Sequence, residues 1–165
     1  MTQSQAPAVE QETAEFSLDS ALCFALYSSV QATMGIYREL LAPWGLTYQQ
    51  YIALTVLWQR GAVTIGELAE SLRLDASTVS GLVRRLERDG LVAKVRDAAD
   101  QRVVRVSCTG RGHELREETS GVPACVATAM TGGTAEGVAQ AGRLIDELHR
   151  LRETLTTPVE PLSAP

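Results

Sequence analysis

The sequence predicts a mainly α-helical protein that carries one small β-hairpin. Three observations lead to this fold class: apolar residues recur at helical spacing, two capping-box motifs open helices, and two valine-rich segments flank a polar turn. An apolar fraction of 45% in 165 residues is ample for the core of one domain. We expect that domain to span residues 17–155, between disordered tails at 1–16 and 156–165.

The first helix is expected within residues 17–42, a segment without proline and with a single glycine. Its stretch LCFALY (22–27) is apolar around the whole helix circumference, and such a surface must be covered on all sides. In a chain of this size, a second subunit would provide the cover. Pro43 and Gly45 end the segment.

Two capping boxes mark the next helices. Thr47-Tyr-Gln-Gln50 places a threonine cap three residues before a glutamine and predicts a helix over 48–59, which Gly61 ends. Thr64-Ile-Gly-Glu67 repeats the motif and opens a short helix, ELAESL. A tight turn at Arg73-Leu74 is expected to follow.

Asp75 is expected to cap a further helix that ends at Gly90. Its apolar residues lie at spacings of 3, 1 and 3, which places them on one face: Val79, Leu82, Val83 and Leu86. Hydroxyl and basic side chains occupy the other face: Ser77, Thr78, Ser80, Arg84, Arg85 and Arg88.

The remaining chain predicts a hairpin and two helices. Valine-rich stretches at 91–96 and 103–107 flank the turn DAADQ and predict two strands. A helix from Thr109, bent around Gly121-Val-Pro123, precedes a last helix over 135–155. The last helix carries an apolar seam suited to pairing with another helix: Ala141, Leu144, Leu148, Leu151 and Leu155.

Two short helices joined by a tight turn and followed by a hairpin are the parts of a winged helix-turn-helix, whose second helix enters the DNA major groove. We place this module at about 46–112, inside a dimerisation frame of helices at about 17–42 and 113–155. Charge supports double-stranded DNA as the partner. Residues 60–112 hold ten Lys and Arg against seven Asp and Glu, although the whole chain carries −5.

The candidate DNA contacts lie on both parts of this module. The hydroxyls of Ser77, Thr78 and Ser80 are expected to contact bases or phosphates, while Arg84, Arg85 and Arg88 bind the backbone or a guanine. On the hairpin, Arg102 is expected to enter a minor groove, with Asp100 orienting its guanidinium. Lys94 is a further candidate on the same hairpin.

Several other classes are disfavoured. No apolar run approaches the ~18 residues of a membrane span, and the polar, acidic start does not resemble a signal peptide, so we expect a cytoplasmic protein. Three scattered cysteines do not form a disulfide framework. The isolated His113 and His149, without any CxxC or HxxxH spacing, give no reason to expect a metal or a cofactor.

The run TIGELAESLRLDASTVSGLVRRLERDGLVAKVRDAADQRVVRVSCTGRG resembles the MarR family of dimeric bacterial transcription regulators. The carrying motifs are LERDGLV, Asp100-Gln-Arg102 in the hairpin, and TGRG. The resemblance covers roughly 17–155 and is strong over 46–116. It implies a homodimer, shaped by the N- and C-terminal helices, on a pseudo-palindromic operator.

The upstream run LCFALYSSVQATMGIYRELLAPWGLTYQQYIALTVLW resembles the OhrR branch, whose members sense organic hydroperoxides. The resemblance implies that Cys23 is the oxidised thiol and that Tyr37 and Tyr48, fourteen and twenty-five residues later, hydrogen-bond it. Tyr27 matches a further tyrosine of some members. Cys125 would be the resolving thiol from the other subunit, with a small thiol as the alternative, whereas Cys108 is expected to be structural.

The expected chemistry needs such residues. A thiolate is the nucleophile, and an ordinary thiol with a pKa near ~8.5 is mostly protonated at neutral pH. Phenol donors stabilise the anion, and a cap at Ser17 or Asp19 would add help from the helix dipole. Attack on a hydroperoxide yields a sulfenic acid. Three rival hypotheses are a regulator that binds a small aromatic acid or phenol between subunits, a thiol peroxidase, and a zinc-sensing regulator that would use Cys, His and carboxylate ligands. The second gives the winged module no role and lacks a CxxC.

Overall fold

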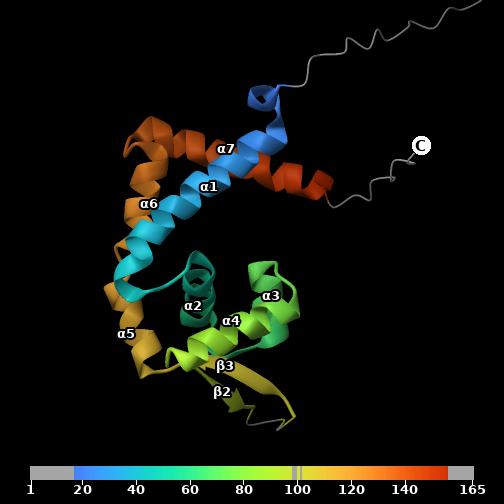
Figure 1. The fold of residues 1–165 in the computed structure, drawn as a ribbon, viewed down its shortest axis with the longest axis vertical. Helices are drawn as coiled ribbons and strands as arrows, with labels where there is room; N and C mark the ends of the chain where they lie inside the picture. The colour runs from blue at the N-terminus through green and yellow to red at the C-terminus, as the bar shows by residue number, and fades with distance from the viewer. Residues whose placement is uncertain (1–16, 98–99, 101, 156–165) are drawn as a thin grey trace, which may run out of the picture. The chain divides into compact units, whose positions relative to one another are not determined.

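The computed structural model describes residues 17–97, 100 and 102–155, and both tails lie outside the described residues. The described chain is mostly helical, with a small antiparallel sheet (Figure 1), which confirms the predicted fold class. It forms two compact units that meet in sequence between Gly35 and Ile36.

The first unit holds the short 3-10 helix η1 (Leu18–Ser20) and most of helix α1 (Leu22–Leu41). Ser17 precedes η1 without a side-chain capping bond, so Ser17, one of the two expected caps of the first helix, does not cap it. The reason is that α1 begins only after Ala21. Most of the apolar stretch is exposed, as Leu22 and Phe24 show, whereas Leu26 is half-buried, and cover of the stretch by a partner remains a prediction.

In the second unit, the end of α1 leads through η2 (Ala42–Trp44) to α2 (Tyr48–Arg60), α3 (Ile65–Leu72) and α4 (Ala76–Arg88). Both predicted capping boxes are present. In the second box, the Thr64 amide donates to Glu67 Oε2 at 2.6 Å and the Glu67 amide donates to Thr64 Oγ1 at 3.1 Å. Arg73 joins α3 to α4 in the left-handed region, with φ of 55°.

The sheet contains the predicted hairpin and one strand that the sequence did not predict. Strands β2 (Val92–Arg96) and β3 (Val104–Cys108) pair antiparallel, and β1 (Val63–Thr64) adds to the free side of β3. Val63 pairs with Val106, so two residues just before α3 extend the sheet. This places β3 in the centre and brings the start of α3 next to the hairpin.

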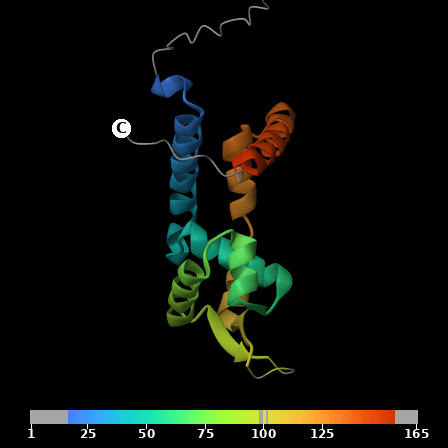
Figure 2. The ribbon, with the colours of Figure 1, turned by 90° about the vertical axis from the view of Figure 1, so that its right-hand side faces the viewer.

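The core of the winged module lies between α2, α3, α4 and the sheet, which contact one another (Figure 2). The predicted apolar face of α4 is fully inside it, with Val79, Leu82, Val83 and Leu86 all at most 1% exposed. Leu54, Leu57 and Leu68 from α2 and α3 pack into the same cluster. Small aliphatic side chains thus build this core, as the scarcity of aromatic residues predicts.

Three helices follow the hairpin: α5 (Gly110–Glu118), α6 (Val122–Thr131) and α7 (Ala135–Leu155). The predicted bend around Gly121-Val-Pro123 is a complete break between α5 and α6. Pro123 lies in the first turn of α6, where its missing N–H costs no hydrogen bond. Helices α6 and α7 pack against each other. None of the helices in the described part of the chain is long and apolar enough to cross a membrane.

The apolar seam predicted on α7 is largely exposed. Leu144 and Leu155 keep 55% and 69% of their surface, and the neighbouring Ile145 keeps 52%. Exposed side chains of this size in a regular row are typical of a surface that another helix covers. Pairing of this seam with a partner helix stays a prediction.

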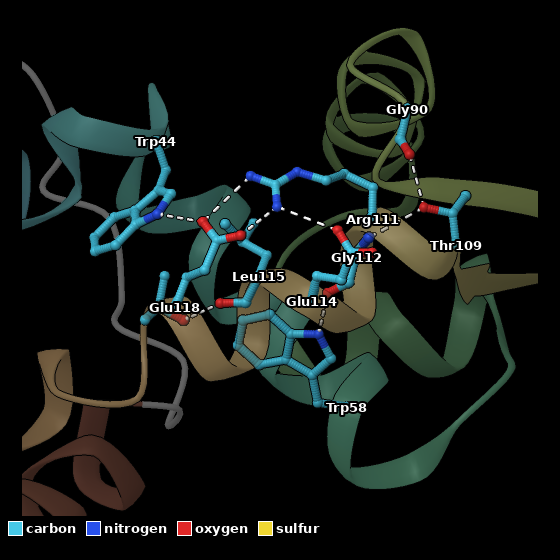
Figure 3. A network of polar contacts seen from close by, with 10 residues as sticks. Trp44, Trp58, Gly90, Thr109, Arg111, Gly112, Glu114, Leu115 and Glu118 are labelled. Carbon is cyan, nitrogen blue, oxygen red and sulfur yellow. Dashed lines mark hydrogen bonds and ion pairs between the residues drawn. The ribbon is translucent and has the colours of Figure 1, made fainter.

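Helix α5 joins the winged module through unusually close packing (Figure 3). Thr109 Oγ1 donates to the Gly90 carbonyl at 2.7 Å and accepts from the Gly112 amide at 3.1 Å. Trp58 Nε1 donates to the Gly112 carbonyl at 2.8 Å. A Cβ atom on Gly112 would lie 2.1 Å from the carbonyl oxygen of Leu91, so the TGRG motif needs glycine at its last position.

A polar network fixes the other end of α5 (Figure 3). Glu118 accepts from Trp44 Nε1 at 2.8 Å and forms a bidentate ion pair with Arg111. Arg111 also reaches Glu114 at 3.4 Å. Since Trp44 belongs to η2, these contacts tie α5 to the segment that leads into α2.

We expect Gly112→Ala to lower the free energy of unfolding by roughly 1–3 kcal/mol, because the added methyl group forces the Leu91 carbonyl and α5 apart. Urea unfolding at a fixed protein concentration measures the loss. Gly110→Ala is the matched control, since nothing lies within 4 Å of a Cβ at that position. Equal stability of the two variants would contradict the close-packing explanation of TGRG.

Candidate nucleic-acid interface and thiol sites

Asp75 organises the start of α4, the helix expected to enter the major groove. Its carboxylate accepts from the Thr78 amide at 2.8 Å, from Ser77 Oγ at 2.5 Å and from Thr78 Oγ1 at 2.6 Å. These bonds, led by the one from Ser77, hold the pKa of Asp75 well below its usual range. The predicted cap is therefore confirmed, and it also occupies the hydroxyl protons of two candidate DNA contacts.

The other predicted residues of α4 lie on the same outward face. Ser80 is half-buried, and its hydroxyl donates to the Ala76 carbonyl at 2.7 Å. Arg84, Arg85 and Arg88 are exposed, and Arg88 contacts Asp89 at 3.2 Å. The hydroxyl and basic groups thus share one accessible surface, opposite the buried face of α4, and their contact with DNA remains a prediction.

The hairpin presents its predicted arginine to solvent. The Arg102 side chain is 92% exposed, and its Nε lies 3.2 Å from Asp100 Oδ1. The same carboxylate accepts from the Arg102 backbone amide at 3.0 Å, and these contacts lower the pKa of Asp100. Lys94 pairs with Glu87 at 2.7 Å, a contact that holds β2 against α4.

Arg105 is a structural residue of this region that the sequence did not single out. From the centre of the sheet, its Nε lies 2.5 Å from Asp97 Oδ2 and its Nη1 lies 3.2 Å from Glu67 Oε2. Asp97 in turn accepts from the Asp100 amide at 3.3 Å. Polar contacts thus run from the start of α3 to the base of Arg102. The sequence offered one sign of this role, an arginine between Val104 and Val106 inside a predicted strand.

Two of the predicted thiol-site tyrosines lie together in the second unit. The ring centroids of Tyr37 and Tyr48 are 4.5 Å apart, and Tyr51 lies 6.2 Å from Tyr37. Burial raises the pKa of Tyr37, with Tyr48 and Tyr51 adding to the shift. Burial likewise raises the pKa of Tyr51. Tyr37 and Tyr51 therefore stay protonated at neutral pH and keep a phenolic O–H to donate. Tyr51 was missed, although it follows Tyr48 by three residues on one helix face.

Cys23 lies in the first unit, where it is the second residue of α1 and is exposed. Its position in the first helical turn favours negative charge nearby. Tyr27, one turn later, accepts from Gln31 Nε2 at 3.1 Å and lies beside Phe24. Contact of Cys23 with the tyrosines of the second unit remains a prediction.

The two other cysteines differ in their surroundings. Cys125 is exposed on α6, whereas Cys108 is half-buried at the end of β3, and burial raises its pKa to about 11. The Cys108 environment agrees with the expected structural role. Among the described residues, no three His, Cys, Asp or Glu side chains gather into a potential metal site.

The three helices, the hairpin and the exposed basic face define a winged-helix protein of the DNA-binding class. The sequence matches the MarR family over residues 46–104. The regulator TtmR of Methylorubrum extorquens is 39% identical over 139 residues, which cover 84% of this chain and 69% of that protein. The organic hydroperoxide resistance transcriptional regulator of Bacillus subtilis is 32% identical over 155 residues, covering 93% and 97% of the two chains.

Among solved structures, a MarR variant from E. coli complexed with operator DNA has the same fold. Its TM-score is 0.71 at 24% identity, over 77% of this chain and 92% of that chain. The chain belongs to the MarR family of transcriptional regulators. MarR regulators bind operator DNA and act as dimers.

We expect Arg102→Ala to weaken binding to a DNA fragment selected by the protein about tenfold, and to lower the slope of log K against log salt by about one per protomer. The reason is that an exposed cation near phosphates releases counterions on binding. Fluorescence anisotropy across a salt series measures both quantities. Arg150→Ala, which removes an exposed cation from α7, is the control and should change neither. An unaltered salt slope for Arg102→Ala would remove this residue from the interface.

With Cys23 and Cys125 both replaced by serine, we expect the remaining Cys108 to react slowly with iodoacetamide at pH 8. Its pKa of about 11 leaves little thiolate, and the labelling rate should rise about tenfold per pH unit below that value. Mass spectrometry follows the labelling, and the same variant unfolded in guanidinium is the control. Equal rates in the folded and unfolded states would contradict the effect of burial.

Proposed function

We propose that this protein is a cytoplasmic homodimeric repressor that leaves its operator when an organic hydroperoxide oxidises Cys23. The observation that carries the proposal is the close pair of Tyr37 and Tyr48, at the spacing from Cys23 that the OhrR branch shares. The similarity to the Bacillus regulator, named for organic hydroperoxide resistance, supports the same conclusion.

The spacing along α1 indicates that the thiol site would join two subunits. Cys23 and Tyr37 both belong to α1, fourteen residues apart. An α-helix rises 1.5 Å per residue, so residues at this spacing are separated by about 21 Å along any regular helix. A hydrogen bond between them within one helix is excluded. The phenols would therefore receive the thiol of the partner subunit, which gives the homodimer a chemical role.

The proposed chemistry has two steps. The Cys23 thiolate attacks one peroxide oxygen, the O–O bond breaks, and the alcohol leaves with a proton while the sulfur becomes a sulfenic acid. Phenolic donors from Tyr37 and Tyr48 would stabilise the thiolate, with Tyr27 as a further neighbour of the sulfur. The Cys125 thiol of the other subunit then displaces water and forms a disulfide. A small thiol could take its place.

This oxidation would switch the regulator once, and the protein would not turn over peroxide as an enzyme does. Each dimer holds two copies of α4, which must meet half-sites about one helical turn apart. A disulfide between subunits that rotates the two winged modules would break this match. Oxidation would thus bias a two-state element and release DNA.

A second candidate function rests on a cavity between α2 and α5–α6. It has a volume of about 220 Å³ and is lined by Tyr51, Trp58 and Arg116 among others. The aromatic walls and Arg116 suit a small aromatic acid, whereas the carboxylate of Glu117, which also lines the cavity, opposes one. In this alternative the regulator would respond to such a ligand, and Cys23 would be incidental.

We expect cumene hydroperoxide to release the reduced protein from DNA in a gel-shift assay, and Cys23→Ser to stay bound because no sulfenic acid can form. Cys108→Ser is the matched control and should be released like the wild type. Non-reducing electrophoresis should show a covalent dimer that requires both Cys23 and Cys125.

Three results would redirect the assignment. Release of Cys23→Ser by the hydroperoxide would exclude the sensing role of that thiol. Release of the wild type by salicylate, without any effect of the hydroperoxide, would favour the aromatic ligand instead. Release of Cys125→Ser by the hydroperoxide only when free cysteine is also added would make a small thiol the resolving group.

A further inference from the structure

Each candidate hydroxyl on the outward face of α4 already donates its proton in a hydrogen bond within the protein. Ser77 Oγ and Thr78 Oγ1 donate to the two carboxylate oxygens of Asp75, at 2.5 and 2.6 Å. Ser80 Oγ donates to the Ala76 carbonyl at 2.7 Å. All three acceptors belong to the start of the same helix.

The direction of these bonds follows from the chemistry of the acceptors. An ionised carboxylate and a peptide carbonyl carry no proton to donate, so each hydroxyl must be the donor. A hydroxyl has one proton and two lone pairs. Once the proton is committed, its oxygen can only accept a hydrogen bond from any further partner.

Groups on DNA differ in whether they donate or accept hydrogen bonds. Phosphate oxygens, guanine O6 and N7, and thymine O4 are acceptors, whereas the amino groups at adenine N6 and cytosine N4 are donors in the major groove. Acceptor-only oxygens match the amino groups and match neither phosphate nor the guanine edge. The charge of Asp75 opposes a nearby phosphate as well.

We infer that the Ser77 and Thr78 hydroxyls select adenine or cytosine in the operator, and that Asp75 is the positioning residue that fixes this preference. The inference rests on the proposed operator binding. It narrows the expectation that these hydroxyls contact bases or phosphates, and it leaves phosphate contacts to exposed cations such as Arg84 and Arg85.

The test uses the full chain and DNA selected from a random pool. The base facing each hydroxyl is the position whose preference disappears in Ser77→Ala or Thr78→Ala. We expect adenine or cytosine there in the wild type. Replacing that base by purine or by 2-pyrimidinone, which lack the amino group, should weaken wild-type binding about fivefold, the effect of one neutral hydrogen bond. The same replacement should have little effect on the matching alanine variant.

Asp75→Asn separates the role of the carboxylate from that of the cap. Asparagine caps helices about as well as aspartate, so α4 is retained, and thermal unfolding checks this. Its amide offers one acceptor oxygen instead of two, which releases at least one hydroxyl proton. We expect the selected DNA to admit guanine or thymine at the positions facing Ser77 or Thr78. Asp75→Asn should leave the base preference at the position facing Ser80 unchanged, because the Ser80 hydroxyl donates to the Ala76 carbonyl and not to Asp75. That position is the one whose preference disappears in Ser80→Ala.

The outcomes are distinguishable. Selection of guanine or thymine opposite Ser77 and Thr78 by the wild type would overturn the inference alone. So would a result in which the alanine variants become insensitive to replacement of a phosphate by methylphosphonate, and not to a change of base. An unchanged base preference in Asp75→Asn would overturn the role of Asp75. A selection that enriches no sequence would overturn operator binding and this inference together, whereas peroxide-insensitive binding with the expected bases would overturn only the redox proposal.

Discussion

The close approach of Gly112 to the Leu91 carbonyl is the constraint on which the second unit depends. It allows α5 to start directly against the turn between α4 and β2, where Thr109 bonds to Gly90. Because that turn ends α4 and begins the hairpin, these contacts fix the position of α4 and of the hairpin relative to α5. The Trp58 bond to the Gly112 carbonyl adds α2 to the same junction.

Several carboxylates of the winged module each bind more than one group. Glu67 completes the capping box of α3 and also pairs with Arg105. Asp75 caps α4 and holds two hydroxyls, and Asp100 binds both the backbone and the guanidinium of Arg102. Each of these acids links the backbone to a side chain: Glu67 to Arg105 in the sheet, Asp75 to the hydroxyls of α4, and Asp100 to Arg102 on the hairpin. The local fold and the orientation of the candidate contacts are therefore determined by the same interactions.

Features encoded within a few residues could be predicted from the sequence. The capping boxes at Thr47 and Thr64, the cap at Asp75 and the apolar face of α4 all depend on neighbours within one or two turns. Strand β1 could not be predicted, because its two residues have no pattern of their own and pair with β3 some forty residues later. The role of Arg105 could not be predicted either, because its acidic partners Glu67 and Asp97 lie outside its own strand.

The candidate thiol site could be predicted only in part from the sequence. The resemblance to the OhrR branch selected Tyr37 and Tyr48, and their rings do pack together. Tyr51 completes the aromatic cluster but has no counterpart in the spacing pattern that identified the other two. The position of Cys23 relative to these rings depends on subunit pairing, which local patterns do not encode. The acceptors of the Ser77 and Thr78 hydroxyls could not be predicted either, because they depend on the side-chain rotamers.

The uneven distribution of charge has a consequence for how this protein meets DNA. Residues 60–112 carry a formal charge of +3, whereas the rest of the chain carries −8. The field of a duplex attracts the basic segment and repels the acidic ones, so encounters through residues 60–112 are favoured over others. The acids outside the winged module thus take part in recognition without touching DNA.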